Sequence, residues 1–238
     1  NRLLNRLSAA DMAELRPNLK IVAMVQGAVL HAAGQAVEQI YFPMSGMVSM
    51  LAVMTTGQQI DTGITGREGL VGGSIGSSGP LSFGQATVQI AGAACRISSP
   101  HFLTTFNKST GLRDLVNGYQ GVMYFQAQQS AACHAIHSVE ARLCRLLLQS
   151  QAVIETDVIE LTQEFVSHML GVQRNAVSLC AHALQESGLI EYSRGSIKIL
   201  NPDGLKDLAC ECYEAVHDYT ELAVPRLSPI ATSSPSAY

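Results

Sequence analysis

The stretch of residues 161–200 most narrows what this chain can fold into. It opens with LTQEFVSHMLGVQRNAVSLCAHALQESGLI, which reads as two short amphipathic helices separated by a glycine. Thr162 is a good N-cap for a helix that continues to Leu170, and Gly171 is the residue type that ends a helix in a left-handed turn. A second helix is predicted to start near Gln173. Two short helices joined by a tight turn that contains glycine form a helix-turn-helix.

The residues after the second helix make this interpretation more specific. That helix is predicted to end at Gly188, and the runs 189–193 and 196–200 then read as two strands around a short turn. A helix-turn-helix followed directly by such a hairpin is a winged helix, which predicts DNA binding. The alternative, a helical hairpin used for packing or protein contacts, stays open. The predicted contact between the two helices involves Phe165, Val166, Met169 and Leu170 on the first, Val172, Val177 and Leu184 on the second, and small Ser167 where they cross.

The polar face of the second helix fits the reading of DNA bases, because the N-terminal side chains of a recognition helix reach base edges in the major groove. Arg174 can donate two hydrogen bonds to guanine O6 and N7. Gln173 or Asn175 can pair with adenine or with a phosphate, and Ser178 lies within one turn of them. The candidate phosphate contacts, which fix position rather than sequence, are Thr162, Arg194 and Lys198.

Charge is the main argument against DNA binding. The formal net charge of the chain is −4, and residues 151–205 contain three basic and seven acidic side chains. A generally basic, nucleic-acid-coating surface is therefore excluded. We expect weak non-specific binding, strong salt sensitivity and a dependence on two sites read by a dimer.

Residues 20–98 read as short strands separated by turns. Many short strands at regular spacing predict an antiparallel barrel or roll. The predicted strands are 39–43, 46–53, 58–64, 85–90 and 93–97. A helix is predicted over 8–16 with Ser8 as its N-cap, and another starts at Ser99, as N-cap, with Pro100 in its first turn.

Residues 111–151 contain no proline and predict one long helix or two consecutive ones, with a break near 134–138. Apolar residues recur with a heptad spacing, which favours a helix paired with its copy in a dimer over a helix packed only on its own domain. Glutamines in this seam would fix its register or face a ligand. The seam consists of Leu112, Tyr119, Gln126 and Cys133 at one position and Leu115, Val122, Gln129 and Ile136 at the other.

These patterns predict an α+β chain in four parts. Residues 1–110 form an antiparallel β-roll of the double-stranded β-helix or jelly-roll type, with short flanking helices. Residues 111–137 form a long dimerisation helix, 138–208 a winged helix-turn-helix, and 209–238 a C-terminal helix with a disordered tail rich in proline and serine. We see neither a membrane span nor a signal peptide, so we expect a cytoplasmic protein.

The six cysteines lie far apart within apolar patterns, which is typical of reduced cytosolic proteins. Cys133 and His137 are four residues apart and thus share one helical face. This spacing can hold a metal with help from elsewhere, and Cys210 and Cys212 would complete the set. The alternative, that the cysteines are packing residues, is favoured. We therefore predict no cofactor and no metal, and a redox or metal role for these residues stays open.

With a winged helix behind a β-roll and a long helix, the chain resembles the Crp/Fnr family of bacterial transcription regulators. The strongest marks are LTQEFVSHMLGVQRNAVSL, ALQESGLIEYSRGSIKIL and HSVEARLCRLLL, and the resemblance runs from residue 8 to about residue 208. It implies a homodimer that binds a palindromic operator in double-stranded DNA, acts with RNA polymerase and responds to a small-molecule effector. It also implies that the chain is not an enzyme.

The recognition helix departs from the family pattern. Members commonly carry Arg, then Glu, then a second Arg one turn later. Here Arg174 matches the first position, whereas Asn175 and Leu179 stand at the other two. The best-known half-site of the family is therefore not expected for this protein.

The effector cassette departs further. Members that bind cyclic nucleotides carry Gly-Glu, a loop, and then Arg-Ser/Thr-Ala. Glu68 matches the ribose-binding glutamate, but Arg67 precedes it, and Gly84 and Gln85 replace the arginine and the hydroxyl residue. A phosphate without its guanidinium loses its main charge-assisted bond. We expect an unknown effector that is not a cyclic nucleotide, and a cyclic-nucleotide-responsive regulator is the alternative. The candidate pocket residues are Arg67, Glu68, Gly69, Gln85, Gln126 and Gln129.

Other sensors and functions are less well supported. No cysteine precedes Cys95, which argues against the iron–sulfur cluster of the oxygen-sensing branch, and no histidine stands out for haem. A metal-dependent β-roll enzyme needs a histidine cluster on its strands, whereas His31 is the only histidine between residues 20 and 98. No nucleophile-elbow or P-loop motif is present. An adaptor that uses the winged helix for protein contacts is a further alternative.

Overall fold

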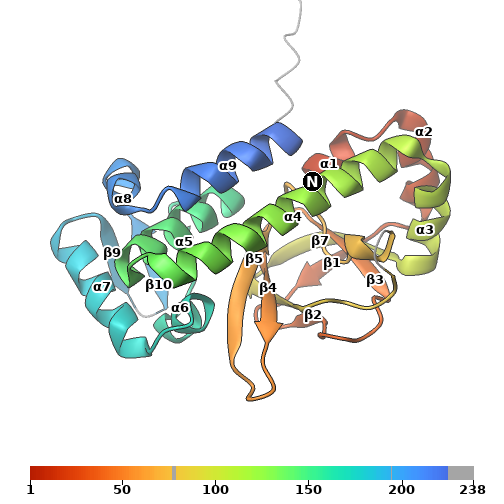
Figure 1. The fold of residues 1–238 in the computed structure, drawn as a ribbon. Helices are drawn as coiled ribbons and strands as arrows, with labels where there is room; N and C mark the ends of the chain where they lie inside the picture. Colours follow the sequence, from red (N-terminus) through yellow and green to blue (C-terminus); the bar gives the residue numbers. More distant parts are fainter. Residues whose placement is uncertain (77–78, 194, 225–238) are drawn as a thin grey trace, which may run out of the picture.

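A long helix, α4 (Thr110–Ile136), crosses the molecule and joins a β-rich lobe to a helical lobe (Figure 1). The computed structural model describes residues 1–76, 79–193 and 195–224. The order of elements is a roll of strands, the long helix and then a winged helix-turn-helix, so the predicted α+β class is confirmed.

The β-rich lobe contains two antiparallel sheets with strand orders β1-β7-β3 and β2-β6-β4-β5. All five predicted strands are present, with ends within one residue of the predicted ones. Two further strands, β1 and β2, were not individually predicted. β1 is largely exposed, so no clean alternation of apolar and polar residues marks it. The bounds are β1 (Lys20–Met24), β2 (Val29–His31), β3 (Gln39–Pro43), β4 (Met47–Val53), β5 (Gln59–Thr65), β6 (Gln85–Ile90) and β7 (Gly92–Ser98).

Short helices close the ends of the roll. Ser8 caps α2 as predicted, because its hydroxyl accepts a hydrogen bond from the Asp11 N–H at 3.1 Å. The predicted N-cap of the helix after the roll is wrong: Ser98 is the cap, and Ser99 is buried with its hydroxyl donating to the Val37 carbonyl. The bounds are α1 (Arg2–Asn5), α2 (Ala9–Leu15), η1 (Arg16–Asn18), η2 (Gly73–Gly76) and α3 (Ser99–Lys108).

Most of the heptad seam predicted for dimer pairing lies inside the chain, and Ile136 at its end is exposed. Leu112, Tyr119 and Cys133 expose 2% or less of their surface. Gln126 is also buried, and its side chain pairs with the backbone of β5: the Ile64 N–H donates to its Oε1 at 3.0 Å, and its Nε2 donates to the Ile64 carbonyl at 3.2 Å. The prediction that this seam pairs with a second copy is therefore wrong. An apolar stripe with this period can pack against any apolar surface. Here that surface is provided mainly by the roll of the same chain.

The helical lobe is a winged helix with a three-stranded sheet of order β8-β10-β9. The predicted break after α4 is confirmed, because His137 ends α4 and the Ser138 hydroxyl caps α5. Strand β8 and helix α8 were not predicted. The bounds are α5 (Val139–Ile154), β8 (Val158–Ile159), α6 (Gln163–Leu170), α7 (Arg174–Glu186), β9 (Ile190–Ser193), β10 (Ser196–Ile199) and α8 (Pro202–Leu208).

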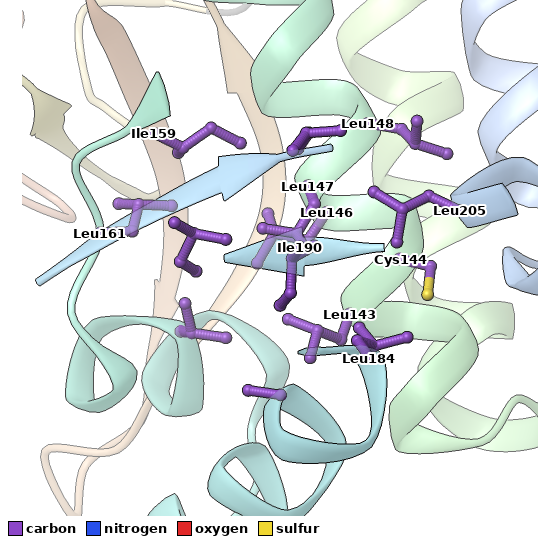
Figure 2. Packing of buried hydrophobic residues seen from close by; sticks show 14 of the residues in the cluster. Leu143, Cys144, Leu146, Leu147, Leu148, Ile159, Leu161, Leu184, Ile190 and Leu205 are labelled. Carbon is purple, nitrogen blue, oxygen red and sulfur yellow. The ribbon is translucent and has the colours of Figure 1, made fainter. Parts of the chain in front are cut away.

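The hydrophobic core of the winged helix extends into the roll. Figure 2 shows its centre, where Leu143 and Leu147 of α5 meet Ile190 of the wing. Three side chains of the roll, Met47, Ile64 and Ile90, belong to the same buried cluster. Gln26 Nε2 adds a hydrogen bond to the Glu160 carbonyl at 3.2 Å. The roll and the winged helix are thus packed directly against each other.

A last helix, α9 (Cys212–Ala223), runs alongside α4 (Figure 1). The rings of Phe125 and Tyr219 stack with centroids 4.6 Å apart, and Arg2 forms an ion pair with Glu221 at 2.8 Å. The C-terminal helix is therefore present as predicted, whereas the predicted disordered tail lies outside the described residues. Within the described part of the chain, no helix has the length and apolarity needed to cross a membrane.

Candidate nucleic-acid interface

The turn between α6 and α7 is built as the sequence predicts. The Thr162 hydroxyl accepts from the Phe165 N–H at 3.2 Å and caps α6. Gly171 ends that helix with a left-handed φ of 61°, and the Val172 N–H bonds back to the Ser167 carbonyl at 3.0 Å. Helix α7 then begins at Arg174. The predicted helix-turn-helix is confirmed.

Helix α7 is held from beneath by buried side chains. Val177, Ala181 and Leu184 face the core that contains Leu170 of α6. Arg142 of α5 donates from Nη1 to the Leu170 carbonyl at 3.3 Å. This bond satisfies an acceptor at the C-terminal end of α6 and places a cation at the negative end of its dipole. The buried face of α7 and the C-terminal end of α6 are thus held in place by the core and by Arg142.

The outward face of α7 presents a charged side chain, an amide and an apolar side chain. Arg174 and Asn175 are exposed in its first turn, next to exposed Gln173. Among the described residues, the Arg174 guanidinium has no ion-pair partner. Leu179 exposes 72% of its surface one turn further along. Leu179 is not among the predicted contacts, although an apolar residue out of phase with Val177 is a detectable signal.

Ser178 is less free than predicted. Its hydroxyl donates to Gln163 Oε1 at 2.7 Å and so links α7 to α6. The next exposed side chain on this face is His182, whose Nε2 lies 3.4 Å from a carboxylate oxygen of Glu186. Ser178 therefore positions the two helices, and its contact with DNA stays a prediction.

The wing lies beside the start of α6. A Cβ placed on Gly195 would be 3.6 Å from Thr162 Cγ2. Lys198 is exposed on β10, opposite Glu191 in the register of the hairpin. Arg194 lies outside the described residues. Two of the three predicted phosphate contacts are thus exposed on the described surface, at the N-terminus of α6 and on the wing.

A hollow of about 750 Å³ separates the β4–β5 hairpin from the turn of the helix-turn-helix. Gln59 and Ile60 line it on one side, and His168 and Gln173 on the other. Arg174 and Asn175 do not line it. The hairpin therefore lies close to the recognition helix without covering these two side chains.

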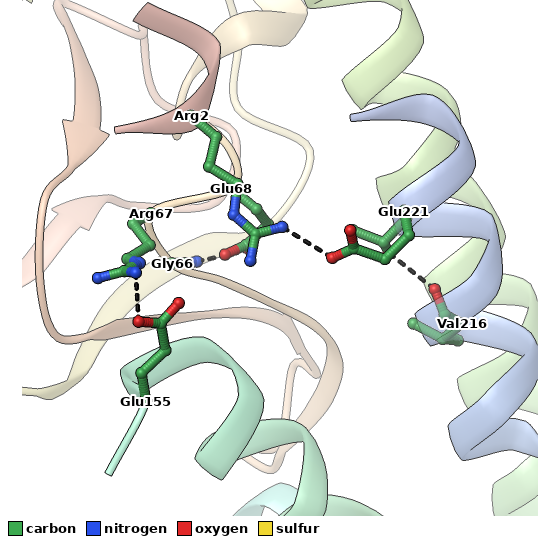
Figure 3. A network of polar contacts seen from close by, with 8 residues as sticks. Arg2, Gly66, Arg67, Glu68, Glu155, Val216 and Glu221 are labelled. Atoms are coloured by element: carbon green, nitrogen blue, oxygen red, sulfur yellow. Dashed lines mark hydrogen bonds and ion pairs between the residues drawn. The ribbon is translucent and has the colours of Figure 1, made fainter. Parts of the chain in front are cut away.

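The predicted effector residues do not form one pocket. Glu68 and Gln126 line a cavity of about 60 Å³ between the roll, α5 and α9. Gln85 lines a different cavity and donates to the Thr87 hydroxyl. Figure 3 shows Arg67 in an ion pair with Glu155 at the end of α5. Gln129 is half-buried on α4 and lines neither cavity.

Tyr119 fills the space above the glycine next to Glu68. A Cβ placed on Gly69 would lie 1.9 Å from Tyr119 Cζ, and the Tyr119 and Thr65 hydroxyls are 2.9 Å apart. Glu68 is buried and accepts from the Gly66 N–H at 2.8 Å (Figure 3). Burial raises the pKa of the Glu68 carboxyl. A side chain of the chain itself thus fills the space beside the matched glutamate.

Comparisons with known proteins agree with this architecture. Residues 141–208 match the model of the Crp-like helix-turn-helix domain. A Crp/Fnr-family regulator from Eubacterium rectale superimposes with a TM-score of 0.67 at 19% identity, over 87% of this chain and 96% of that one. FixK2 from Bradyrhizobium japonicum gives 0.69 at 13% identity, over 81% and 98%. The c-di-GMP-responsive regulator CLP from Xanthomonas campestris gives 0.64 at 16% identity, over 81% and 99%.

The search of curated proteins found no match. At the identities given above, the structural similarity establishes the fold, and the family model independently identifies the winged-helix region. The chain therefore has the fold of the Crp/Fnr transcription regulators and carries a Crp-like helix-turn-helix domain at residues 141–208.

Proposed function

We propose that this protein is a transcription regulator that reads a palindromic DNA operator as a homodimer and that no cyclic nucleotide gates it. The observation that carries the proposal is the exposed Arg174–Asn175 pair at the start of α7, supported from beneath by a packed winged helix. As a regulator of transcription it would act together with RNA polymerase at the operator.

The exposed face of α7 suggests which bases it reads. A guanidinium is the commonest bidentate partner of guanine, and an asparagine amide pairs bidentately with adenine. Exposed Leu179 supplies an apolar surface for a thymine methyl group. The proposed half-site therefore contains a G·C pair for Arg174 beside an A·T pair for Asn175. Gln173, Thr162 and Lys198 are proposed to contact the flanking backbone.

The proposed dimer uses the exposed strip of α4, on the side of the helix opposite Leu112 and Tyr119. Tyr124 exposes 67% of its surface in the middle of this strip. Several small residues allow a second helix to approach closely, and spacings that alternate between four and three residues fit a coiled coil. The exposed residues of the strip are Thr110, Asp114, Asn117, Tyr124, Gln128, Ala131 and Ala135, and Gly121 lies at its edge, half-buried beside Tyr219 of α9.

Ala131→Arg is expected to dissociate this dimer. In a symmetric pair each new guanidinium would lie close to the guanidinium of the second chain or to one of its small strip residues. Charge repulsion or steric overlap would then weaken association by about tenfold or more. Sedimentation equilibrium measures the dimer constant directly. Thr104→Arg, on an exposed site of α3 outside the strip, is the matched control and is expected to leave the constant unchanged. A dimer that tolerates Ala131→Arg would use another surface.

The lack of room at Glu68 supports an effector other than a cyclic nucleotide. Ligand pockets usually have volumes of about 300–1,000 Å³. The cavity beside Glu68 has about 60 Å³, enough for about two water molecules. The Tyr119 ring stands over Gly69, and Gly84 offers no guanidinium for a phosphate.

Selection of bound DNA from a random pool tests the proposed function. The purified full chain is used in buffer, with added cyclic nucleotide and with cell extract. We expect a palindrome with half-sites centred about 34 Å apart, the same with and without cyclic nucleotide. Absence of any enriched sequence in all three arms contradicts DNA reading, and enrichment of an asymmetric single site contradicts the dimer. Enrichment that requires the cyclic nucleotide contradicts the proposed effector class.

A further inference from the structure

Four side chains with metal-binding atoms meet where α4 ends and α9 begins. Cys133 lies in the last turn of α4 and His137 immediately follows that helix. Cys210 precedes α9, and Cys212 is its first residue. The three sulfur atoms and a ring nitrogen all lie within 4.8 Å of one another. The backbone therefore gathers a complete set of four ligands from two elements far apart in the sequence.

Two distances within this cluster are close to those of a tetrahedral site, and the others are at most 4.8 Å. Cys133 Sγ lies 3.5 Å from Cys210 Sγ, and Cys212 Sγ lies 3.7 Å from His137 Nδ1. Bonds of about 2.3 Å from zinc to sulfur and about 2.0–2.1 Å to nitrogen place two tetrahedral sulfurs about 3.8 Å apart. They place a sulfur and a nitrogen about 3.6 Å apart. An ion can thus enter the cluster with only small movements of the ligands.

The surroundings of His137 have the features of a ligand's support. Its Nδ1 faces Cys212, and its Nε2 lies 3.2 Å from a carboxylate oxygen of Glu211. Metal-bound histidines usually donate their second ring N–H to such a carboxylate, which fixes the tautomer and the ring orientation. Glu211 stands between the two cysteines Cys210 and Cys212 in the sequence, so one short segment supplies two sulfurs and the supporting carboxylate.

Charge around the cluster also suits an anionic ligand set. A bound dication would draw the protons off these thiols. Arg145, anchored by its bond to the Ser130 hydroxyl at 2.9 Å, would offset part of the negative charge of three thiolates.

We propose that Cys133, His137, Cys210 and Cys212 bind one Zn²⁺ ion in a closed tetrahedral Cys₃His site. Three thiolates and one imidazole are the donor set that selects zinc over the oxygen-preferring Mg²⁺ and Ca²⁺. Four protein ligands leave no open position, so the site is structural rather than catalytic. It joins α9 to the junction between α4 and α5, which is the junction between the roll and the winged helix.

The first test is the metal content and spectrum of the full chain. Protein purified with reductant and without chelator is expected to contain one zinc per chain by elemental mass spectrometry. Cobalt added to the zinc-free chain is expected to give thiolate charge-transfer absorption and the strong visible bands of tetrahedral coordination. Three results together would overturn the proposal: less than about one-tenth zinc per chain, no such cobalt spectrum, and cysteine thiols that react as free thiols.

Single substitutions assign the ligands. Cys212→Ser and His137→Ala are each expected to weaken zinc binding by about tenfold or more. Cys95→Ser, a half-buried cysteine on β7 outside the cluster, is the matched control and is expected to retain one zinc. His137→Cys is expected to keep the metal, and it decides the matter if Cys212→Ser does not fold. Recovery of a Cys133–Cys210 disulfide in place of zinc, from protein purified with reductant, overturns the site.

Discussion

Arg174→Ala is expected to lower operator affinity by about 30-fold to more than about 10,000-fold while the chain stays folded. Each bidentate contact with guanine is worth about 1–3 kcal/mol, and a symmetric dimer loses two. The side chain is exposed and has no ion-pair partner among the described residues, so stability is expected to stay nearly the same. Fluorescence anisotropy with the selected operator measures the affinity, and thermal unfolding checks the fold.

Two further variants make the result specific to the guanidinium. Arg174→Lys keeps the charge but lacks the planar fork, so we expect it to bind DNA with weaker discrimination between sequences. Lys206→Ala removes an exposed cation from α8 of the same lobe and is expected to change operator affinity little. Equal affinities for Arg174→Ala and the parent chain would favour an adaptor that uses the winged helix for protein contacts.

Gly69→Ala is expected to destabilise the folded chain by about 3 kcal/mol, the upper end of the usual cost of overpacking. The added methyl group would lie 1.9 Å from Cζ of a Tyr119 ring that is completely buried. Urea unfolding monitored by circular dichroism should show a lower midpoint at an unchanged slope.

Gly118→Ala is the matched control for that substitution. It adds the same methyl group to α4 at a position with no neighbouring atom within 4 Å. Because alanine favours a helix over glycine, this control is expected to gain about 0.5–1 kcal/mol. Combining Gly69→Ala with Tyr119→Leu removes the clashing ring atoms and should cost less than the two separate changes added together. Equal midpoints for Gly69→Ala and the parent would mean that Tyr119 does not occupy this space.

The elements marked by local signals could be predicted from the sequence. Thr162, Gly171 and Gly188 mark the limits of the two helices of the helix-turn-helix, and each acts through its own backbone conformation or cap. The central strands of the roll were found for the same reason, since turns and β-branched runs are short-range patterns. Arg174 and Asn175 could be chosen as candidate base contacts because they lie in the first turn of the predicted second helix.

What depends on distant partners could not be predicted. The stripe through Leu112 and Tyr119 indicates burial, but its period does not say whether a second copy or the chain's own roll covers it. The partner of Ser178 is a glutamine 15 residues earlier. Cys133 and Cys210 are 77 residues apart, so the sequence offered them only as one possible metal set and the folded chain shows that they meet. Considered singly, each of these cysteines looks like a packing residue.

The burial of Met47, Ile64 and Ile90 in the core of the winged helix limits how a signal can travel. Baring three large apolar side chains costs about 5–9 kcal/mol at about 1.5–3 kcal/mol each. A rotation that moves the winged helix away from the roll would expose all three side chains and would cost this full free energy. A sliding movement of about one side chain's width keeps the three side chains buried. Regulation of this protein is therefore expected to consist of short shear steps between neighbouring lobes.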